Sequence, residues 1–178
     1  MTKKLLATAA LCTLLTAPAL AQESPQAVAT FLNIEGQTIG TVELTEDENG
    51  VRIFGDVTGL PGGGTHGFHI HETGDCDPTT DFESAGDHFN PGGEAHGFEH
   101  AEGHHAGDIE NQIASADGTI EIDVTVDSVT LGEGETSVFD EDGSALVLHA
   151  DADDYISQPA GASGDRIACA VIEAAPTE

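Results

Sequence analysis

The sequence has very few basic residues. Lysine and arginine together number 4 in 178 residues, against 33 aspartates and glutamates, and the formal net charge is −29. A surface this negative repels nucleic acid and anionic membranes, so both are excluded as partners. Acidic composition of this kind is common in disordered chains, but regularly alternating apolar residues instead predict a folded protein for most of the length.

The sequence also lacks an apolar run of the roughly 20 residues that a membrane-spanning helix needs. The apolar stretch from Leu5 to Ala17 is shorter, follows Lys3-Lys4 and precedes the small residues Ala19-Leu20-Ala21. This order is typical of a cleaved signal peptide. We therefore predict a signal peptide over residues 1–21 and one exported domain over residues 22–178, located in the periplasm or secreted.

Cysteine is scarce, with 3 residues in the chain. Cys12 lies in the predicted signal peptide, which leaves Cys76 and Cys169. An even pair in an exported protein favours a disulfide, and closing a loop of roughly 90 residues is worth up to about 4 to 5 kcal/mol on the chain-entropy model. Two buried free thiols are the alternative, which the position of Cys76 in a loop rich in Gly, Asp and Pro disfavours.

No segment shows a sustained helical period with caps. Apolar residues instead alternate at every second position, as they do in strands. A turn signal, Glu48-Asn49-Gly50, separates two of these segments, and such spacing predicts an antiparallel β-sandwich or barrel. The alternating segments are residues 28–34, 39–44, 51–57, 120–126, 145–148 and 167–171.

Two stretches break the alternation, Thr73 to Asp108 and Asp151 to Asp165, and loops this long are uncommon unless they are functional. Candidate metal ligands lie in these loops or on the strands beside them. His69 and His71 are two apart, so their side chains leave the same face of a strand. The first loop adds three imidazoles and a carboxylate, a set that suits tetrahedral zinc. The candidate ligands, spaced for two neighbouring metal ions, are His69, His71, His88, His96, His105, Asp108 and His149.

Six short motifs occur in a recognisable order along the chain. They are HGFHIHETGDC from His66, SAGDHFNP from Ser84, HG at His96, HHAGD at His104, LVLHADADD from Leu146 and GDRIACAVI from Gly164. Together, over about residues 28 to 172, they resemble the copper/zinc superoxide dismutase family, and its bacterial periplasmic branch matches best because a cysteine follows closely after Gly-Asp. The resemblance implies an all-β, eight-stranded antiparallel Greek-key barrel, an immunoglobulin-like sandwich with long metal-binding and electrostatic loops.

The resemblance also divides the candidate ligands between two metals. Imidazoles bind both redox states of copper, while the harder carboxylate goes to redox-inert zinc. The implied copper ligands are His69, His71, His88 and His149, and the implied zinc ligands are His88, His96, His105 and Asp108, with His88 shared.

Other residues acquire roles by the same resemblance. Asp153 is expected to accept hydrogen bonds from His69 and His96 and so to orient both rings. His66 is expected to bond to backbone and is excluded from the metal sites. Two more histidines, His100 and His104, match no ligand of the family and are expected on the surface of the first loop.

Arg166 is one of two bases outside the predicted signal peptide, where 2 arginines face 33 acids and the net charge is −31 (2 − 33). The resemblance places Arg166 at the mouth of the copper site, where it attracts superoxide. A strand-end arginine paired with one of many carboxylates is the alternative. Two departures concern the channel and the loop packing: the segment Ala160 to Gly164 lacks the family's threonine, and Ala170 replaces a glycine.

The implied activity converts superoxide to dioxygen and hydrogen peroxide by copper redox cycling, with zinc structural and His88 releasing copper on reduction and carrying a proton. Two other function classes are weighed against it. A non-catalytic exported copper/zinc-binding β-domain is expected to lose a copper ligand or Arg166, and an acidic calcium-binding or adhesion domain predicts no spaced histidines. The copper ligands, Arg166 and the spaced histidines are all present, which favours the enzyme over both alternatives. Members of the bacterial branch include monomers and dimers, so a homodimer stays open.

Overall fold

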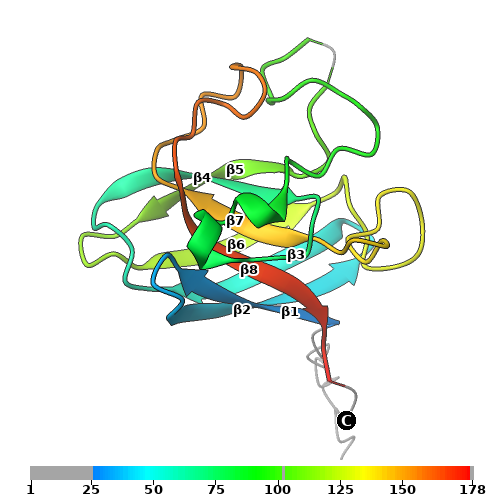
Figure 1. The fold of residues 1–178 in the computed structure, drawn as a ribbon. Helices are drawn as coiled ribbons and strands as arrows, with labels where there is room; N and C mark the ends of the chain where they lie inside the picture. Colours follow the sequence, from blue (N-terminus) through cyan, green and yellow to red (C-terminus); the bar gives the residue numbers. More distant parts are fainter. Residues whose placement is uncertain (1–25, 102, 177–178) are drawn as a thin grey trace, which may run out of the picture.

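Eight antiparallel strands build the fold in this computed structural model, which describes residues 26–101 and 103–176 (Figure 1). The predicted signal peptide and Cys12 lie outside the described residues. In chain order the strands are β1 (Ala27–Asn33), β2 (Thr38–Asp47), β3 (Gly50–Val57), β4 (Gly64–His71), β5 (Asp108–Ala114), β6 (Ile120–Val126), β7 (Ala145–His149) and β8 (Arg166–Ala174).

The strands are hydrogen-bonded in the order β5-β4-β7-β8-β1-β2-β3-β6, and the edge strands β5 and β6 approach each other to give a nearly closed barrel. Neighbours that are not consecutive in the chain, such as β1 with β8 and β4 with β7, require the crossover connections of a Greek key. The predicted turn at Glu48-Asn49 joins β2 to β3, where Asp47 pairs with Gly50. The predicted all-β Greek-key barrel is therefore confirmed.

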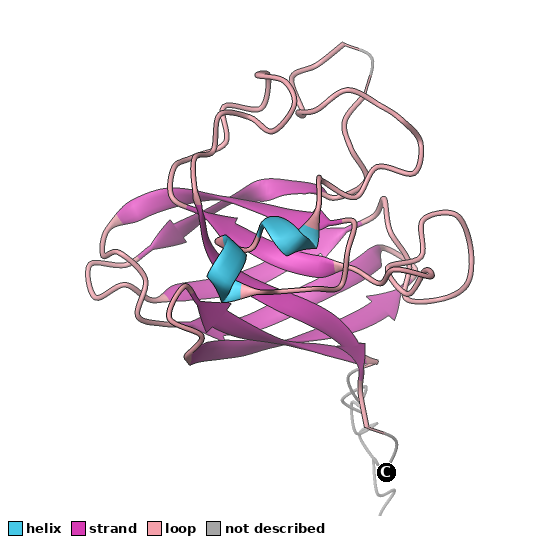
Figure 2. Ribbon diagram, viewed as in Figure 1, coloured by secondary structure: helices cyan, strands magenta, loops and turns pink. Residues whose placement is uncertain are grey.

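Two short 3₁₀ turns, η1 (Pro78–Thr80) and η2 (Glu83–Ala85), interrupt the first predicted loop (Figure 2). Within the described residues, no helix is long and apolar enough to cross a membrane.

One strand, β5, was not among the alternating segments. Its sequence, Asp-Ile-Glu-Asn-Gln-Ile-Ala, is mostly polar, and its two isoleucines differ in burial. Ile109 lies in the core, but the Ile113 side chain is 74% exposed. Two of the buried residues of this strand, Asp108 and Gln112, are polar. Apolar alternation therefore could not reveal this strand.

Strands β4 and β7 are buried on both faces, unlike β1 or β6, whose residues alternate between buried and exposed or part-buried. Phe68 and Ile70 point into the main core of the barrel. On the opposite face, His69 pairs with Val147 and His71 pairs with Ala145. This outer face is covered by the two long loops, so the histidines are buried although they do not lie inside the barrel.

A second, smaller core lies on this outer face. It joins Phe82 and Ala85 from the first loop to Val147 of β7 and to Cys169 of β8. Cys169 is bonded to Cys76, with a Cα–Cα distance of 5.6 Å and a sequence separation of 93 residues. The predicted disulfide is confirmed, and it fastens the first loop to β8.

The two long loops lie on the same side of the barrel and touch each other (Figure 1). Glu99 N donates to Tyr155 O at 3.2 Å. Gly97, with φ of +100°, approaches Tyr155 so closely that a Cβ at this position would overlap the Tyr155 carbonyl. Only glycine permits this contact, which brings the second loop over the ligands of the first.

Candidate metal centre

Four buried histidines converge beneath the loops. His69 and His71 come from β4, His149 ends β7, and His88 forms an isolated bridge with His71 from the first loop. Their ligand atoms all lie within 4.8 Å of one another. Within the described residues, one nitrogen of each ring is buried without a hydrogen-bond partner: His69 Nδ1, His71 Nε2, His88 Nε2 and His149 Nε2.

Burial lowers the pKa of all four rings. The pKa of His88 falls to about 4 and that of His149 to about 3, chiefly through desolvation, and the pKa values of His69 and His71 are also lowered by burial. The rings are therefore neutral at neutral pH and offer lone pairs. Four such unpartnered lone pairs are costly in a protein interior unless a cation binds them.

The second nitrogen of each ring is held by the protein. His71 Nδ1 donates to Gly86 O at 2.9 Å, and His149 Nδ1 donates to Gly164 O at 3.3 Å. His69 Nε2 lies 2.7 Å from Asp153 Oδ2. Such contacts fix the orientation of ligating imidazoles.

Asp108 gathers a second group of donors. Its Oδ1 lies 2.9 Å from His88 Nδ1, 3.0 Å from His96 Nδ1 and 3.4 Å from His105 Nδ1. Its Oδ2 accepts hydrogen bonds from the backbone N–H groups of Gly97 and His105. Burial alone would raise the pKa of Asp108, but these contacts hold it well below its usual range. Three imidazole nitrogens around one carboxylate oxygen form a set that suits zinc.

His88 belongs to both groups. Its Nδ1 lies 2.9 Å from Asp108 Oδ1, its Nε2 is buried without a hydrogen-bond partner, and the residue is a member of both groups of possible metal ligands. The His88 ring also stacks on that of His69, with centroids 3.9 Å apart. The structure therefore brings all seven predicted ligands into two buried groups that share this one ring.

Asp153 links the two groups. Its Oδ2 lies 2.7 Å from His69 Nε2 and its Oδ1 lies 3.0 Å from His96 Nε2, as the resemblance implies. Desolvation alone would lower the pKa of His96, but the carboxylates of Asp108 and Asp153 raise it to about 9. His69 Nε2 and His96 Nε2 both contact the Asp153 carboxylate, so this residue connects the two ligand groups. We call His69, His96 and Asp153 the brace.

Sequence reasoning missed two amides that support this brace. Asn111 Nδ2 donates to Asp153 O, and Asp153 N donates to Asn111 Oδ1, both at 2.8 Å. Gln158 pairs with the backbone of His96 in the same manner: His96 N donates to Gln158 Oε1, and Gln158 Nε2 donates to His96 O, both at 2.9 Å. No spacing rule in the sequence distinguishes these amides from ordinary surface residues.

The three remaining histidines, His66, His100 and His104, lie outside both groups. His66 Nδ1 donates to His149 O at 2.7 Å, which is the expected bond to backbone. His104 donates to His105 O, and its ring lies 4.5 Å from that of Phe98. Both His100 and His104 are half-buried, so their expected surface position is only partly correct. Phe98 packs between the rings of His104 and Tyr155, which helps to cover His104.

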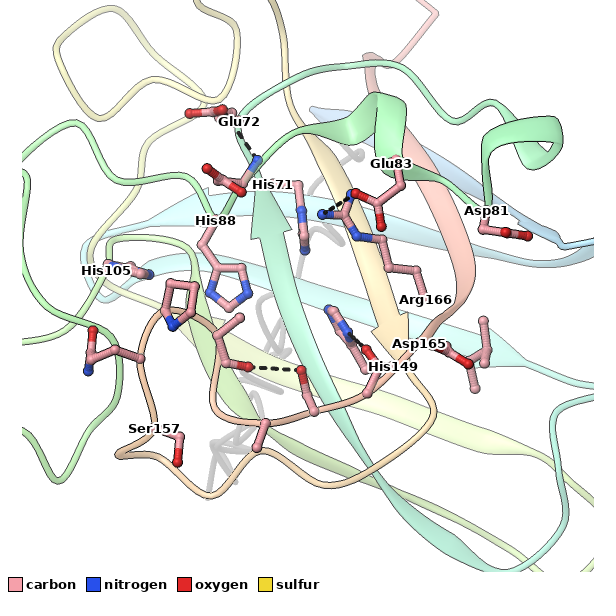
Figure 3. Close-up of a pocket in the computed structure, with 18 of the residues that line it drawn as sticks. His71, Glu72, Asp81, Glu83, His88, His105, His149, Ser157, Asp165 and Arg166 are labelled. Atoms are coloured by element: carbon pink, nitrogen blue, oxygen red, sulfur yellow. Dashed lines mark hydrogen bonds and ion pairs between the residues drawn. The ribbon is translucent and has the colours of Figure 1, made fainter.

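A cavity of about 890 Å³ opens onto the first ligand group (Figure 3). His71, His88 and His149 line it, and Arg166 lies beside them. Arg166 Nη1 donates to Phe82 O and its Nη2 donates to Gly86 O, both at 2.7 Å. The cavity is also lined by Ala160 and Ala162, from the segment that departs from the family pattern. The arrangement places a fixed cation at the approach to unpartnered imidazoles, which suits a small anion.

Comparisons with known proteins agree with this geometry. A family model described as copper/zinc superoxide dismutase (SODC) matches residues 38–172. Superoxide dismutase Cu-Zn 2 of Aquifex aeolicus is 48% identical over 148 residues, which cover 83% of this chain and 86% of the relative. Superoxide dismutase Cu-Zn 1 of the same organism is 44% identical over 165 residues, covering 92% and 96%. Among solved structures, a double mutant of a SOD-like protein from Bacillus subtilis has a TM-score of 0.77 and 42% identity, covering 81% of this chain and 95% of that protein.

Proposed function

Because the chain belongs to the copper/zinc superoxide dismutase family, we propose that it converts superoxide to dioxygen and hydrogen peroxide. The observation that carries the proposal is the ring of His88, which belongs to both buried groups of possible metal ligands. A single structural metal site needs no such ring.

The donor sets fit the two metals of the family. The first offers four neutral imidazoles, which suit copper in both of its redox states, and the second includes the carboxylate that suits zinc. We assign the copper site to His69, His71, His88 and His149. The zinc site comprises His88, His96, His105 and Asp108.

A bound copper ion would supply one-electron redox chemistry for superoxide, and a bound zinc ion would have a structural role. The protein's residues bind the anion and manage protons. The fixed guanidinium of Arg166 attracts the anion into the cavity that His71 and His149 line. Formation of hydrogen peroxide consumes two protons, and His88 Nε2, a buried ring nitrogen without a hydrogen-bond partner, is the atom that would carry one of them.

Gly86 couples these roles. Its carbonyl accepts hydrogen bonds from both Arg166 Nη2 and His71 Nδ1. The anion-attracting group and a copper ligand therefore share one backbone acceptor.

The experiment that tests this function is superoxide dismutation by the purified protein loaded with copper and zinc, before and after copper chelation. We expect activity that is lost on chelation and restored by copper. A protein that carries both metals in full but has no activity would instead be a non-catalytic metal-binding domain.

Export of the chain belongs to the same proposal. Residues 1–21 act as the signal peptide, and the mature domain over 22–178 resides in the periplasm or is secreted. The disulfide between Cys76 and Cys169 supports this location because such bonds persist in oxidising compartments. Sequencing the amino terminus of the exported protein tests the cleavage site, which we expect just before Gln22.

A further inference from the structure

The mouth of the ligand cavity carries one arginine and several carboxylates. Arg166 is the cation of this lining, in which the acidic residues are Glu72, Asp81, Glu83, Asp87 and Asp165 (Figure 3). An anion that approaches the copper site must pass these acids. Their effect depends on how close each lies to Arg166.

Among the described residues, Glu83 is the one whose carboxylate is paired with Arg166. Its Oε2 lies 3.8 Å from Arg166 Nη2, which is within ion-pair distance but too long for a hydrogen bond. The guanidinium is already held by the carbonyls of Phe82 and Gly86 at 2.7 Å. Glu83 therefore contributes charge at this place and is not needed to hold Arg166 in position.

The backbone fixes where this charge lies. Glu83 is the first residue of η2 and follows Phe82, whose side chain is completely buried in the smaller core. Ala85, two residues later, is buried in the same core. The Glu83 side chain itself is 75% exposed. A carboxylate is thus presented at the open rim of the cavity by a well-anchored turn.

We propose that Glu83 offsets the charge of Arg166 and thereby limits the rate at which small anions enter the cavity. The proposal rests on the superoxide dismutase function, in which the entering anion is superoxide. Charges at the approach to a cleft change the on-rate of a charged ligand. One unit charge as close to Arg166 as the Glu83 carboxylate, 3.8 Å away, is expected to alter that on-rate by roughly two- to tenfold.

Glu83→Gln tests the proposal because it removes the charge and preserves the shape of an exposed side chain. Glu121→Gln is the matched control, since Glu121 is an exposed acid on β6 outside the cavity lining and changes the net charge equally. We expect kcat/KM of the metal-loaded Glu83→Gln protein to rise by about two- to tenfold at low ionic strength. The gain should shrink as salt screens it, and the control should match the unsubstituted protein.

A second measurement does not depend on turnover. The copper(I)- and zinc-loaded protein is diamagnetic, so the side-chain N–H signals of Arg166 can be followed by NMR while inorganic phosphate is added. We expect Glu83→Gln to bind phosphate more tightly than the Glu121→Gln control. Equal behaviour of the two variants in rate and in phosphate affinity would overturn the proposal, whether both change or neither does.

The two hypotheses fail in different ways. If the loaded, unsubstituted protein has no dismutase activity, the proposed function fails, while the phosphate titration still measures the effect of Glu83. If that protein is active and Glu83→Gln behaves as the control does, only the role of Glu83 is wrong.

Discussion

The two faces of β4 contrast sharply although they alternate along one strand. Phe68 and Ile70 pack into the barrel, while His69 and His71 point the other way and meet the loops. The inner face obtains its burial from other strands, and the outer face obtains it from loop segments tied down by the disulfide. Stability and metal binding are therefore supported by opposite sides of the same strand, and each side can be perturbed separately.

Removing the shared ligand should produce the largest effect and should be confined to the outer face. In His88→Ala both ligand groups lose a member, so dismutase activity should fall by at least about a thousandfold, equivalent to about 4 kcal/mol. The barrel should still fold, because its main core does not include His88. Activity assays and thermal unfolding measure the two effects.

The control for this substitution is His100→Ala, which removes an imidazole of the same loop that belongs to neither ligand group. Comparable loss of activity in both variants would show that dismutase activity depends on the integrity of the loop and not on the shared ring of His88.

The reverse experiment perturbs the inner face. Phe68→Ala empties a fully buried position in the main core and should lower the free energy of unfolding by about 3 to 5 kcal/mol. Molecules that remain folded should bind copper and zinc in the same ratio as before. Denaturant unfolding combined with metal analysis checks this, with Ile113→Ala as a control at a position that is 74% exposed. Loss of one metal from the folded fraction would mean that the two faces are not separable.

The brace between the two ligand groups offers a smaller perturbation. Asp153→Asn retains the shape of the side chain but cannot accept hydrogen bonds on both of its terminal atoms. Because such partners orient ligating rings, the affinity for copper, zinc or both should fall by about 10- to 100-fold. Competition with a chelator measures the affinity. The neighbouring exposed Asp154→Asn should change it little, and an unaltered affinity in Asp153→Asn would argue that Asn111 and Gln158 hold the loops by themselves.

Much of this contrast was predictable from the sequence, because apolar residues at every second position indicate that one face of a strand is buried. This alternation identified β1 and β6, for example, and the two-residue spacing of His69 and His71 placed both on one face. Alternation fails for β5, where polar residues such as Asp108 are buried beside the loops. The resemblance to a family, and not periodicity, divided the ligands into two sets.

Contacts between loops could not be predicted. The hydrogen bonds of Asn111 and Gln158 join positions that are tens of residues apart. Both residue types are also common on solvated surfaces, so their identity does not reveal these contacts. The same is true of the ion pair between Glu83 and Arg166, which arises because Phe82 anchors the turn. Such contacts depend on the path of the backbone, which composition and spacing do not encode.

The smallest expected effect concerns salt. The body of the protein is strongly negative, whereas Arg166 is a single cation at the cavity, so repulsion of superoxide should act over distances about equal to the Debye length of about 8 Å at physiological salt. We expect kcat/KM to stay flat or to rise with ionic strength, by less than about tenfold. A steep fall between low and high salt would mean that Arg166 and the metals alone determine the local field.

The central claim is that two metal ions lie on the outer face of the barrel and share His88. The most direct measurement is a crystal structure of the loaded protein with anomalous diffraction recorded at the copper and zinc absorption edges. The account predicts a copper peak beside His88 Nε2, among His69, His71 and His149, and a zinc peak beside His88 Nδ1 and Asp108. A single metal peak, or two peaks not bridged by His88, would contradict it.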